Sequence, residues 1–322
     1  MPTQSRALRL RRGVFIAILG LASCQSGKSV ILAPVKNEHG SVAVAGTRVA
    51  APQAVIATTL GRGPAPQASA STTPRGAAPQ AGDGPRLPTP NSGFDYQLGG
   101  AYPVPVGVTV VGRDRTDMPA SGVYSICYVN GFQTQPGEHA SWITNHPELV
   151  LRDVNNQPVI DPTWPDEYIL DVSSAPKRDA IAAIIDVWID GCAASGFQAV
   201  EIDNLDTYAR FPTRLTIDNA IALAQTYRDR AHAASLAIAQ KNAADMVARR
   251  SETRFDFAVV EQCGEFSECG AFTLGYGDQV YDIEYKQSAF NSACARFPQL
   301  SIVRRDVNLV VASNPAYVRE AC

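Results

Sequence analysis

A single (β/α)8 TIM barrel of the α/β class is the fold that the sequence predicts. Between residues 93 and 322, eight short β-rich runs alternate with helical patterns, and most of these runs end in polar side chains. Mostly apolar runs suit the strands of a parallel sheet, and eight repeats favour closure into a barrel. An open doubly wound sheet is the alternative. It would more often carry a glycine-rich phosphate loop after its first strand, and none is visible.

The eight runs have the apolar, β-branched composition expected of strands. They are Val108–Gly112, Tyr124–Asn130, Tyr168–Val172, Ala199–Asp203, Ala237–Gln240, Phe257–Glu261, Val280–Glu284 and Ser301–Arg305. A helix is expected to begin near Ser174, because Pro176 suits a first turn and isoleucines then recur at helical spacing. Further helices are expected over Thr216–Ala234 and Asp245–Arg250.

Residues 1–24 have the features of a secretory signal peptide. Four arginines between positions 6 and 12 precede the apolar run Val14–Leu21, which is too short to span a bilayer permanently. The run ends in Leu21-Ala22-Ser23-Cys24, which resembles a bacterial lipobox whose cysteine is lipidated. We therefore expect an exported protein, extracellular or in the cell envelope, with a lipid anchor on Cys24. An ordinary signal peptide with an incidental cysteine is the alternative.

Residues 25–92 predict a disordered tether between this anchor and the barrel domain, residues 93–322. The segment is rich in Ala, Pro, Gly, Ser, Thr and Gln and contains no aromatic residue. Such a composition buries too little apolar surface to offset the entropy that ordering would cost.

The barrel region predicts disulfides. Of the seven cysteines, six remain after Cys24, and an even number in an exported chain suits disulfide pairing. A zinc site is the competing interpretation, but no CxxC pair is present and no histidine lies near these cysteines. We predict three pairs. Cys263–Cys269 closes a short loop, and Cys294–Cys322 ties down the C-terminal residue. Cys127–Cys192 is the pair that remains.

Polar side chains at the ends of the predicted strands indicate an active site. In barrel enzymes the carboxyl ends of the strands and the loops that follow them build the site. Burying this many polar groups without a function would be costly. The residues are Tyr128, Asn130, Asp171, Glu201, Asp203, Asn204, Lys241, Asn242, Glu261, Glu284 and Tyr285, with Asp206 in the loop after the fourth strand.

Two strands carry the carboxylates best placed for catalysis. Side chains alternate along a strand, so Glu201 and Asp203 face the same way while Ile202 faces the other. Glu261 ends the sixth run and is expected at the same mouth. Because glycoside hydrolysis typically uses two carboxylates, the pattern predicts a glycosidase.

Other function classes have weaker support. The net charge is -3 and no basic patch is visible, which argues against a nucleic-acid partner. No GxSxG elbow and no histidine pair with metal-ligand spacing is present. We expect a polysaccharide substrate and neither a cofactor nor a metal. We also expect a monomer that is attached to a membrane only through its lipid anchor. A barrel that binds carbohydrate without cleaving it, and a metal-dependent hydrolase of another class, remain the alternatives.

Five segments together resemble glycoside hydrolase family 114, the endo-α-1,4-polygalactosaminidases. They are Phe94–Gly100, Tyr128–Gln133, Glu201–Asp206, Gln240–Asn242 and Phe255–Cys263. The resemblance implies a barrel that cleaves α-1,4-linked galactosamine or N-acetylgalactosamine polymers without a redox cofactor. It also adds Asp95 and Tyr96 to the candidate substrate-binding residues.

The family's proposed catalytic pair is an Asp that ends the fourth strand and a Glu that ends the sixth. These positions correspond to Asp203, as nucleophile or electrostatic stabiliser, and Glu261, as general acid/base. Glu201 is the alternative to Asp203 in that role.

Overall fold

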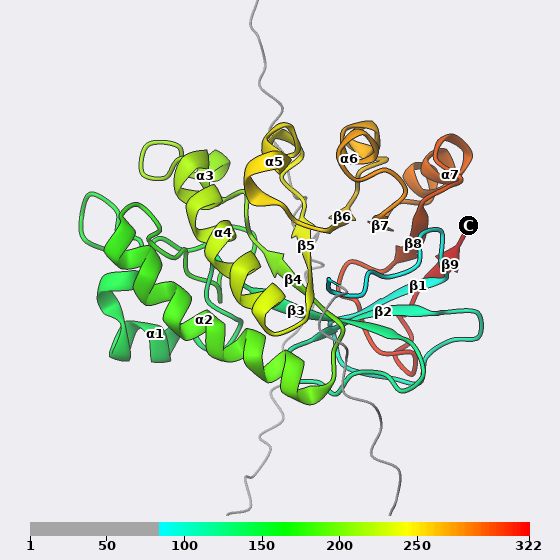
Figure 1. The fold of residues 1–322 in the computed structure, drawn as a ribbon, viewed down its shortest axis with the longest axis horizontal. Coiled ribbons are helices and arrows are strands. Elements are labelled where there is room, and N and C mark those ends of the chain that lie inside the picture. Colours follow the sequence, from blue (N-terminus) through cyan, green and yellow to red (C-terminus); the bar gives the residue numbers. More distant parts are fainter. Residues whose placement is uncertain (1–83) are drawn as a thin grey trace, which may run out of the picture. The chain divides into compact units, whose positions relative to one another are not determined.

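A nine-stranded sheet forms the centre of the fold, with its strands in chain order (Figure 1). The computed structural model describes residues 84–322, so the predicted signal peptide, Cys24 and most of the predicted tether lie outside the described residues. Strands β1 to β8 are parallel, and β9 runs antiparallel to β8. The strands are β1 Phe94–Gln97, β2 Val110–Asp114, β3 Tyr124–Asn130, β4 Ala199–Asp203, β5 Ala237–Lys241, β6 Phe257–Glu261, β7 Val280–Glu284, β8 Ser301–Arg305 and β9 Arg319–Ala321.

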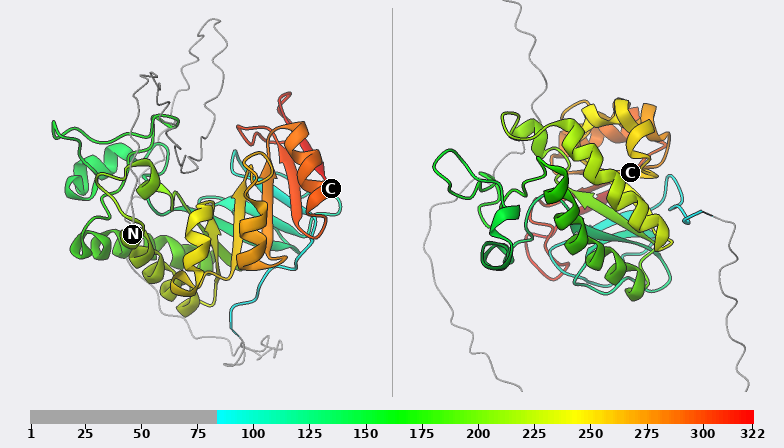
Figure 2. Two further views of the ribbon diagram at one scale, coloured as in Figure 1. Left: turned by 90° about the horizontal axis from the view of Figure 1, so that it is seen from above. Right: turned by 60° about the vertical axis from the view of Figure 1, so that its left-hand side comes forward.

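Helices cover the outside of strands β3 to β8, as Figure 2 shows from two further sides. They are α1 His139–Asn145, η1 Pro147–Leu149, α2 Ala175–Ser195, α3 Thr207–Arg210, α4 Ile217–Ala233, η2 Ala244–Arg249, α5 Arg250–Thr253, α6 Cys269–Tyr276 and α7 Gln287–Arg296. The predicted helices after Ser174 and over Thr216–Ala234 are confirmed, and α4 begins with a capping box between Thr216 and Asn219. Among the described helices, none is both long and apolar enough to cross a membrane.

The strands separate two apolar layers, which we call the inner core and the outer core. The inner core fills the barrel and includes Tyr96, Tyr128, Ala239 and Val259. The outer core lies between the strands and helices such as α2 and α4, and includes Ile202. The predicted alternation is confirmed, because Ile202 packs outwards whereas Glu201, its neighbour in sequence, contacts Tyr96 of the inner core.

Gly112 of β2 makes room in the inner core for the Tyr96 ring. A Cβ atom at position 112 would lie 2.6 Å from Cδ2 of Tyr96, closer than side-chain contacts allow. Tyr96 is itself fully buried. A glycine on one strand thus permits a tyrosine on its neighbour to reach the centre of the barrel.

Tyr168–Val172 is not a strand of the barrel, so the third predicted strand is wrong. This segment makes only isolated antiparallel bridges within the long connection between β3 and α2, for example Val150 with Leu170. Its apolar residues Ile169, Leu170 and Val172 pack in the outer core. A short, mostly apolar run looks the same in sequence whether it pairs in a loop or in the barrel.

The strand that the prediction omitted is β1. Phe94–Gln97 is short and places Asp95 and Gln97 in buried positions, so it lacks the apolar pattern of its neighbours. The total of eight parallel strands is therefore confirmed, although one predicted member is replaced. The (β/α)8 class also holds with a modification, because no helix lies between β1 and β2 or between β2 and β3.

Arg305 joins the two ends of the sheet. Its side chain is fully buried, and Nη1 lies 3.2 Å from Oδ1 of Asp95 and also donates to the carbonyl of Tyr96. Nε donates to the carbonyl of Val318, 2.9 Å away, next to β9. Arg319 adds a further hydrogen bond to β1, from Nη2 to the carbonyl of Phe94 at 3.1 Å. Guanidinium groups therefore bridge the seam between β1 and β8.

The three predicted disulfides are confirmed. Cys127–Cys192 links β3 to α2, Cys263–Cys269 closes the loop between β6 and α6, and Cys294–Cys322 ties the C-terminal residue to α7. The other end of the domain is also held, because the Tyr124 hydroxyl donates to the carbonyl of Arg86 at 2.6 Å. Residues just before the predicted domain boundary therefore contact the barrel.

Replacement of Arg305 by Met is expected to destabilise the domain by about 3 kcal/mol, because it removes the fully buried partner of Asp95 and leaves only Arg319, whose Nε lies 3.4 Å from the same oxygen. Urea unfolding measures the change. Arg304→Met is the matched control. Arg304 pairs with the part-exposed Glu320 and is expected to cost only about 0–1 kcal/mol. Equal losses for both variants would contradict the bridging role of Arg305.

Candidate active site

Lys241, the last residue of β5, is the centre of the candidate site. Its side chain is 1% exposed, and Nζ lies 3.1 Å from Oε1 of Glu201, 3.3 Å from Oδ2 of Asp203 and 3.2 Å from Oε2 of Glu261. The carboxylates come from β4 and β6, the strands on either side of β5. They raise the pKa of Lys241 well above its ordinary value, against the opposing effect of burial, so the ammonium stays charged.

Each of the three carboxylates also accepts a hydrogen bond from a tyrosine. The Tyr96 hydroxyl donates to Oε1 of Glu201 at 2.5 Å, and that of Tyr128 donates to Oδ2 of Asp203 at 2.8 Å. Tyr285 donates to Oε1 of Glu261. Burial raises the pKa of all three tyrosines well above the ordinary value, so they remain protonated donors. One cation and three phenols thus hold the carboxylates in place.

Exposure separates the three carboxylates. The side chains of Asp203 and Glu261 are 17% and 22% exposed, whereas that of Glu201 is fully buried. The pKa of Glu201 is raised to about 7, first by its burial and also by Asp203. A ligand that enters from solvent can reach Asp203 and Glu261, and Glu201 lies beneath them.

The chain turns sharply directly after each of the three strand ends in this site. Asn204, Asn242 and Gln262 have φ angles of 65°, 48° and 63°, in the left-handed region that non-glycine residues rarely adopt. Asn242 is fixed further, because its Oδ1 accepts a hydrogen bond of 2.8 Å from the backbone N–H of Glu261. Strained backbone of this kind persists where its surroundings hold it, and it gathers at functional sites.

A polar network beside β4 holds the loop that follows Asp203. Nδ2 of Asn204 donates to Oδ1 of Asn130 at 3.0 Å, and Nη2 of Arg210 donates to Oδ1 of Asn204 at 2.9 Å. The same guanidinium binds Oδ1 of Asp206 at 3.0 Å and also pairs with Asp161. The predicted residues Asn130, Asn204 and Asp206 are therefore brought together next to the catalytic candidates.

Glu167 belongs to this region and was missed by the sequence prediction. Its Oε2 accepts a hydrogen bond of 2.8 Å from Nδ2 of Asn130. Its pKa is raised to about 8, first by burial and then by the nearby charge of Asp203. The sequence prediction took Tyr168–Val172 as a barrel strand. Glu167 precedes that segment, so the prediction put it at the amino end of the strand, away from the mouth of the barrel. Its position directly before an apolar run offered no signal of its own.

Three predicted substrate-binding residues lie away from the Lys241 cluster. Asp95 faces Arg305 at the seam. Asp171 binds Lys177 and Ser173 at the start of α2; these hydrogen bonds outweigh its burial and lower its pKa. Glu284, on the outer face of β7, accepts a hydrogen bond of 2.6 Å from the backbone N–H of Gly264. Asp171 and Glu284 therefore support loops around the site, and Asp95 supports the seam.

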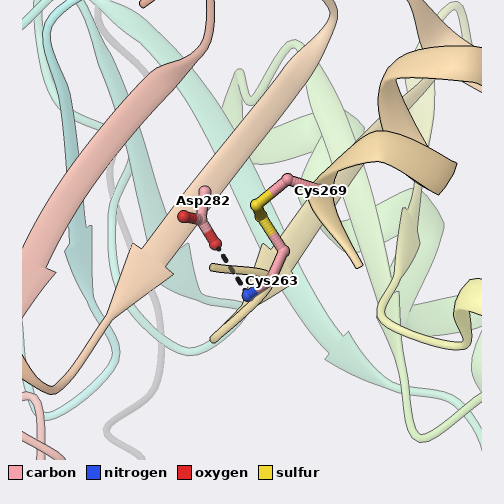
Figure 3. A group of neighbouring side chains, drawn as sticks. All are labelled: Cys263, Cys269 and Asp282. Atoms are coloured by element: carbon pink, nitrogen blue, oxygen red, sulfur yellow. Dashed lines mark hydrogen bonds between the residues drawn. A yellow bond between two sulfur atoms is a disulfide. The ribbon is translucent and has the colours of Figure 1, made fainter. Parts of the chain in front are cut away.

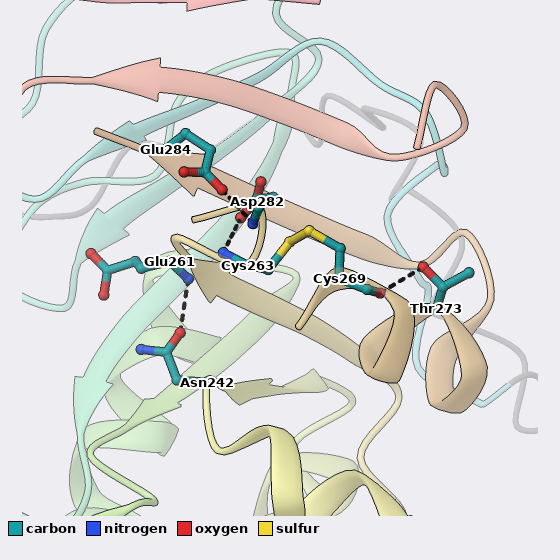
Figure 4. Close-up of a disulfide and its surroundings, with 8 residues drawn as sticks. Asn242, Glu261, Cys263, Cys269, Thr273, Asp282 and Glu284 are labelled. Atoms are coloured by element: carbon teal, nitrogen blue, oxygen red, sulfur yellow. Dashed lines mark hydrogen bonds between the residues drawn. A yellow bond between two sulfur atoms is a disulfide. The ribbon is translucent and has the colours of Figure 1, made fainter. Parts of the chain in front are cut away.

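Asp282 and Glu284 form a buried pair beside the Cys263–Cys269 disulfide (Figure 4). Asp282 accepts a hydrogen bond of 3.3 Å from the backbone N–H of Cys263 (Figure 3). Burial and the charge of Glu284 raise the pKa of Asp282 well above its ordinary value, so Asp282 is the protonated member of the pair. The pair fixes the chain just beyond Glu261.

Cys263, Cys269 and Asp282 also place three atoms of metal-ligand type within 4.8 Å of one another. The two sulfur atoms are joined to each other (Figure 3), so neither is a free thiolate that could bind a metal. This grouping therefore serves to fix the loop after β6.

Comparison with known proteins decides the family. The sequence model of Glycoside-hydrolase family GH114 matches residues 74–322. The chain belongs to glycoside hydrolase family GH114, and it is a glycoside hydrolase with the barrel fold of that family. The resemblance noted from its motifs is thereby confirmed.

Two solved structures share the fold of this GH114 member. Ega3 from Aspergillus fumigatus, in complex with galactosamine, has a TM-score of 0.60 and 22% sequence identity over 76% of this chain and 100% of that one. A variant of the glycoside hydrolase domain of PelA from Pseudomonas aeruginosa has a TM-score of 0.50 and 11% identity over 71% and 98% of the two chains. No curated protein matches the chain.

Glu167 is expected to make stability depend on pH. Its folded-state pKa of about 8 lies above the ordinary value of 4.5, so the folded form holds this proton more tightly. The contribution is fully present below about pH 4.5 and is lost as the pH rises towards about 8. We therefore expect the free energy of unfolding of Glu167→Gln to fall less over this range than that of the unaltered protein.

Urea unfolding at a series of pH values tests this expectation. Asp278→Asn, an exposed carboxylate next to the amino end of β7, is the control and is expected to run parallel to the unaltered protein. Parallel curves for Glu167→Gln as well would contradict the raised pKa of Glu167.

Proposed function

We propose that this glycosidase is exported and cleaves α-1,4-linked galactosamine polysaccharide by a two-carboxylate mechanism. The observation that carries the proposal is that one ammonium group, on β5, pairs with both Asp203 at the end of β4 and Glu261 at the end of β6, and that both carboxylates are partly exposed at the barrel mouth. Family membership supports the reaction type, and the likeness in fold to Ega3, solved with galactosamine, supports the choice of sugar.

The spacing of the two carboxylates favours retention of configuration. Oδ2 of Asp203 and Oε2 of Glu261 lie 3.3 and 3.2 Å from the same nitrogen, so they can be no more than the sum of these distances, 6.5 Å, apart. A tetrahedral ammonium donating to both would hold them about 5 Å apart, the separation typical of retaining glycosidases. Inverting enzymes need a wider gap that admits a water molecule.

In this mechanism Asp203 is the nucleophile and Glu261 the general acid/base. Glu261 donates a proton to the glycosidic oxygen as the C–O bond to the leaving sugar breaks, while Asp203 forms a bond to the anomeric carbon. Glu261 then removes a proton from the water that displaces Asp203. Two hydrogen bonds hold Asp203 in an orientation suited to this attack. The Tyr128 hydroxyl donates to Oδ2 of Asp203, and the backbone N–H of Asn204 donates to its Oδ1 at 2.6 Å.

The charge around the site favours an amino sugar with a free amine. Lys241 alone would repel a cationic substrate, but three carboxylates share its single charge. Asp206 adds an anion on the β4 side, where it is paired with Arg210. With Glu261 protonated as the acid, Asp203 and the ionised form of Glu201 still outnumber the single charge of Lys241, which favours an ammonium group over an anionic sugar.

Export is the second part of the proposal. Three disulfides are typical of a chain that folds in an oxidising compartment. With the signal-like N-terminus, they support release from the cytoplasm and anchoring through a lipid on Cys24. Cys24→Ala is expected to move the protein from the membrane fraction to the soluble fraction, as fractionation and immunoblotting would measure. Unchanged membrane association would contradict the anchor.

Asp203→Asn and Glu261→Gln test the catalytic pair. Each is expected to lower kcat/KM for α-1,4-galactosamine oligosaccharides by about 10²–10⁴-fold, because a nucleophile or a proton donor is lost while the shape of the side chain is kept. Reducing-end release measures the rate, and circular dichroism checks that the variants are folded.

The exposed Asp278→Asn is the matched control for Asp203→Asn and is expected to retain full activity. Full activity in both site variants would refute the assignment. Binding of oligosaccharide without turnover by the unaltered protein would instead favour a non-catalytic barrel. Comparison of acetylated and deacetylated oligomers tests the sugar, and the deacetylated form is expected to be cleaved faster.

A further inference from the structure

Glu201 is a buried carboxylate that the two-carboxylate mechanism does not use. Its side chain is fully buried, and Oε1 contacts both the Tyr96 hydroxyl at 2.5 Å and Nζ of Lys241 at 3.1 Å. Its second oxygen, Oε2, is buried without a hydrogen-bond partner among the described residues. Leaving such a group unsatisfied is costly, which calls for a functional explanation.

The position of Glu201 relative to Lys241 supplies that explanation. Lys241 has a long, flexible side chain, and its ammonium can adopt many positions unless it is bound from several sides. Asp203 and Glu261 bind it from the partly exposed mouth. Glu201 and the Tyr96 hydroxyl, at 3.2 Å from Nζ, bind it from the buried interior.

We propose that Glu201 is a positioning residue, which anchors the Lys241 ammonium from within the barrel so that one cation serves both Asp203 and Glu261. The inference rests on the proposed function of that pair. Without Glu201 the ammonium would pair more closely with whichever mouth carboxylate is ionised. The spacing of nucleophile and acid/base would then no longer be set by a common cation.

Glu201→Gln separates positioning from a purely structural role, because it keeps the shape and an acceptor for Tyr96 while removing the charge. We expect kcat to fall roughly 10–100-fold with KM changed less than about twofold, since Glu201 does not reach the substrate. Tyr96→Phe, which removes one hydrogen bond to Glu201 and one contact with Lys241, should lower kcat in the same way but by less.

Asp256→Asn, which removes a part-buried carboxylate just before β6 at the opposite end of the barrel, is the control and should leave kcat unchanged. An unchanged kcat in Glu201→Gln, or a rise in KM alone, would overturn the proposal. If Asp203→Asn and Glu261→Gln are inactive while Glu201→Gln behaves like the unaltered enzyme, only this inference fails. Activity in the first two refutes the proposed function itself.

Discussion

A buried ammonium group makes the arrangement at the barrel mouth possible. Three carboxylates on β4 and β6 would repel one another strongly inside a protein if they had no counter-charge. Lys241 lies on the strand between them and contacts all three. Each carboxylate also accepts a hydrogen bond from a tyrosine, and a residue with a left-handed backbone conformation follows each of the three strand ends. The active site therefore depends on one cation placed at the centre of an anionic cluster.

Much of the fold could be predicted because strand and helix have different periods. The alternation of Glu201, Ile202 and Asp203 between the two faces of β4 follows directly from strand geometry. Errors arose where local pattern and tertiary context disagreed. Tyr168–Val172 has a strand pattern but pairs inside a loop, and Phe94–Gln97 is a strand whose buried Asp95 is neutralised by Arg305 from the far end of the chain.

The candidate site was predictable to the extent that it lies at strand ends. Asp203, Lys241 and Glu261 end consecutive strands, and a barrel brings such positions together. Glu167 could not be found this way, because it lies in a long connection whose path depends on contacts with Asn130. Glu284 has the right position along its strand but the wrong face, since its neighbour Ile283 occupies the inner core.

The seam of the barrel has a consequence for how the protein is made. Tyr96 reaches Glu201 only when β1 is in place, and β1 is held by Arg305 and Arg319 from the end of the chain. A chain that leaves a ribosome or a membrane channel from its N-terminus exposes β1 long before those partners emerge. Until then the sheet has an open edge and the interior anchor of Lys241 is incomplete. The enzyme can therefore become active only after Arg305 and Arg319 have emerged and bound β1.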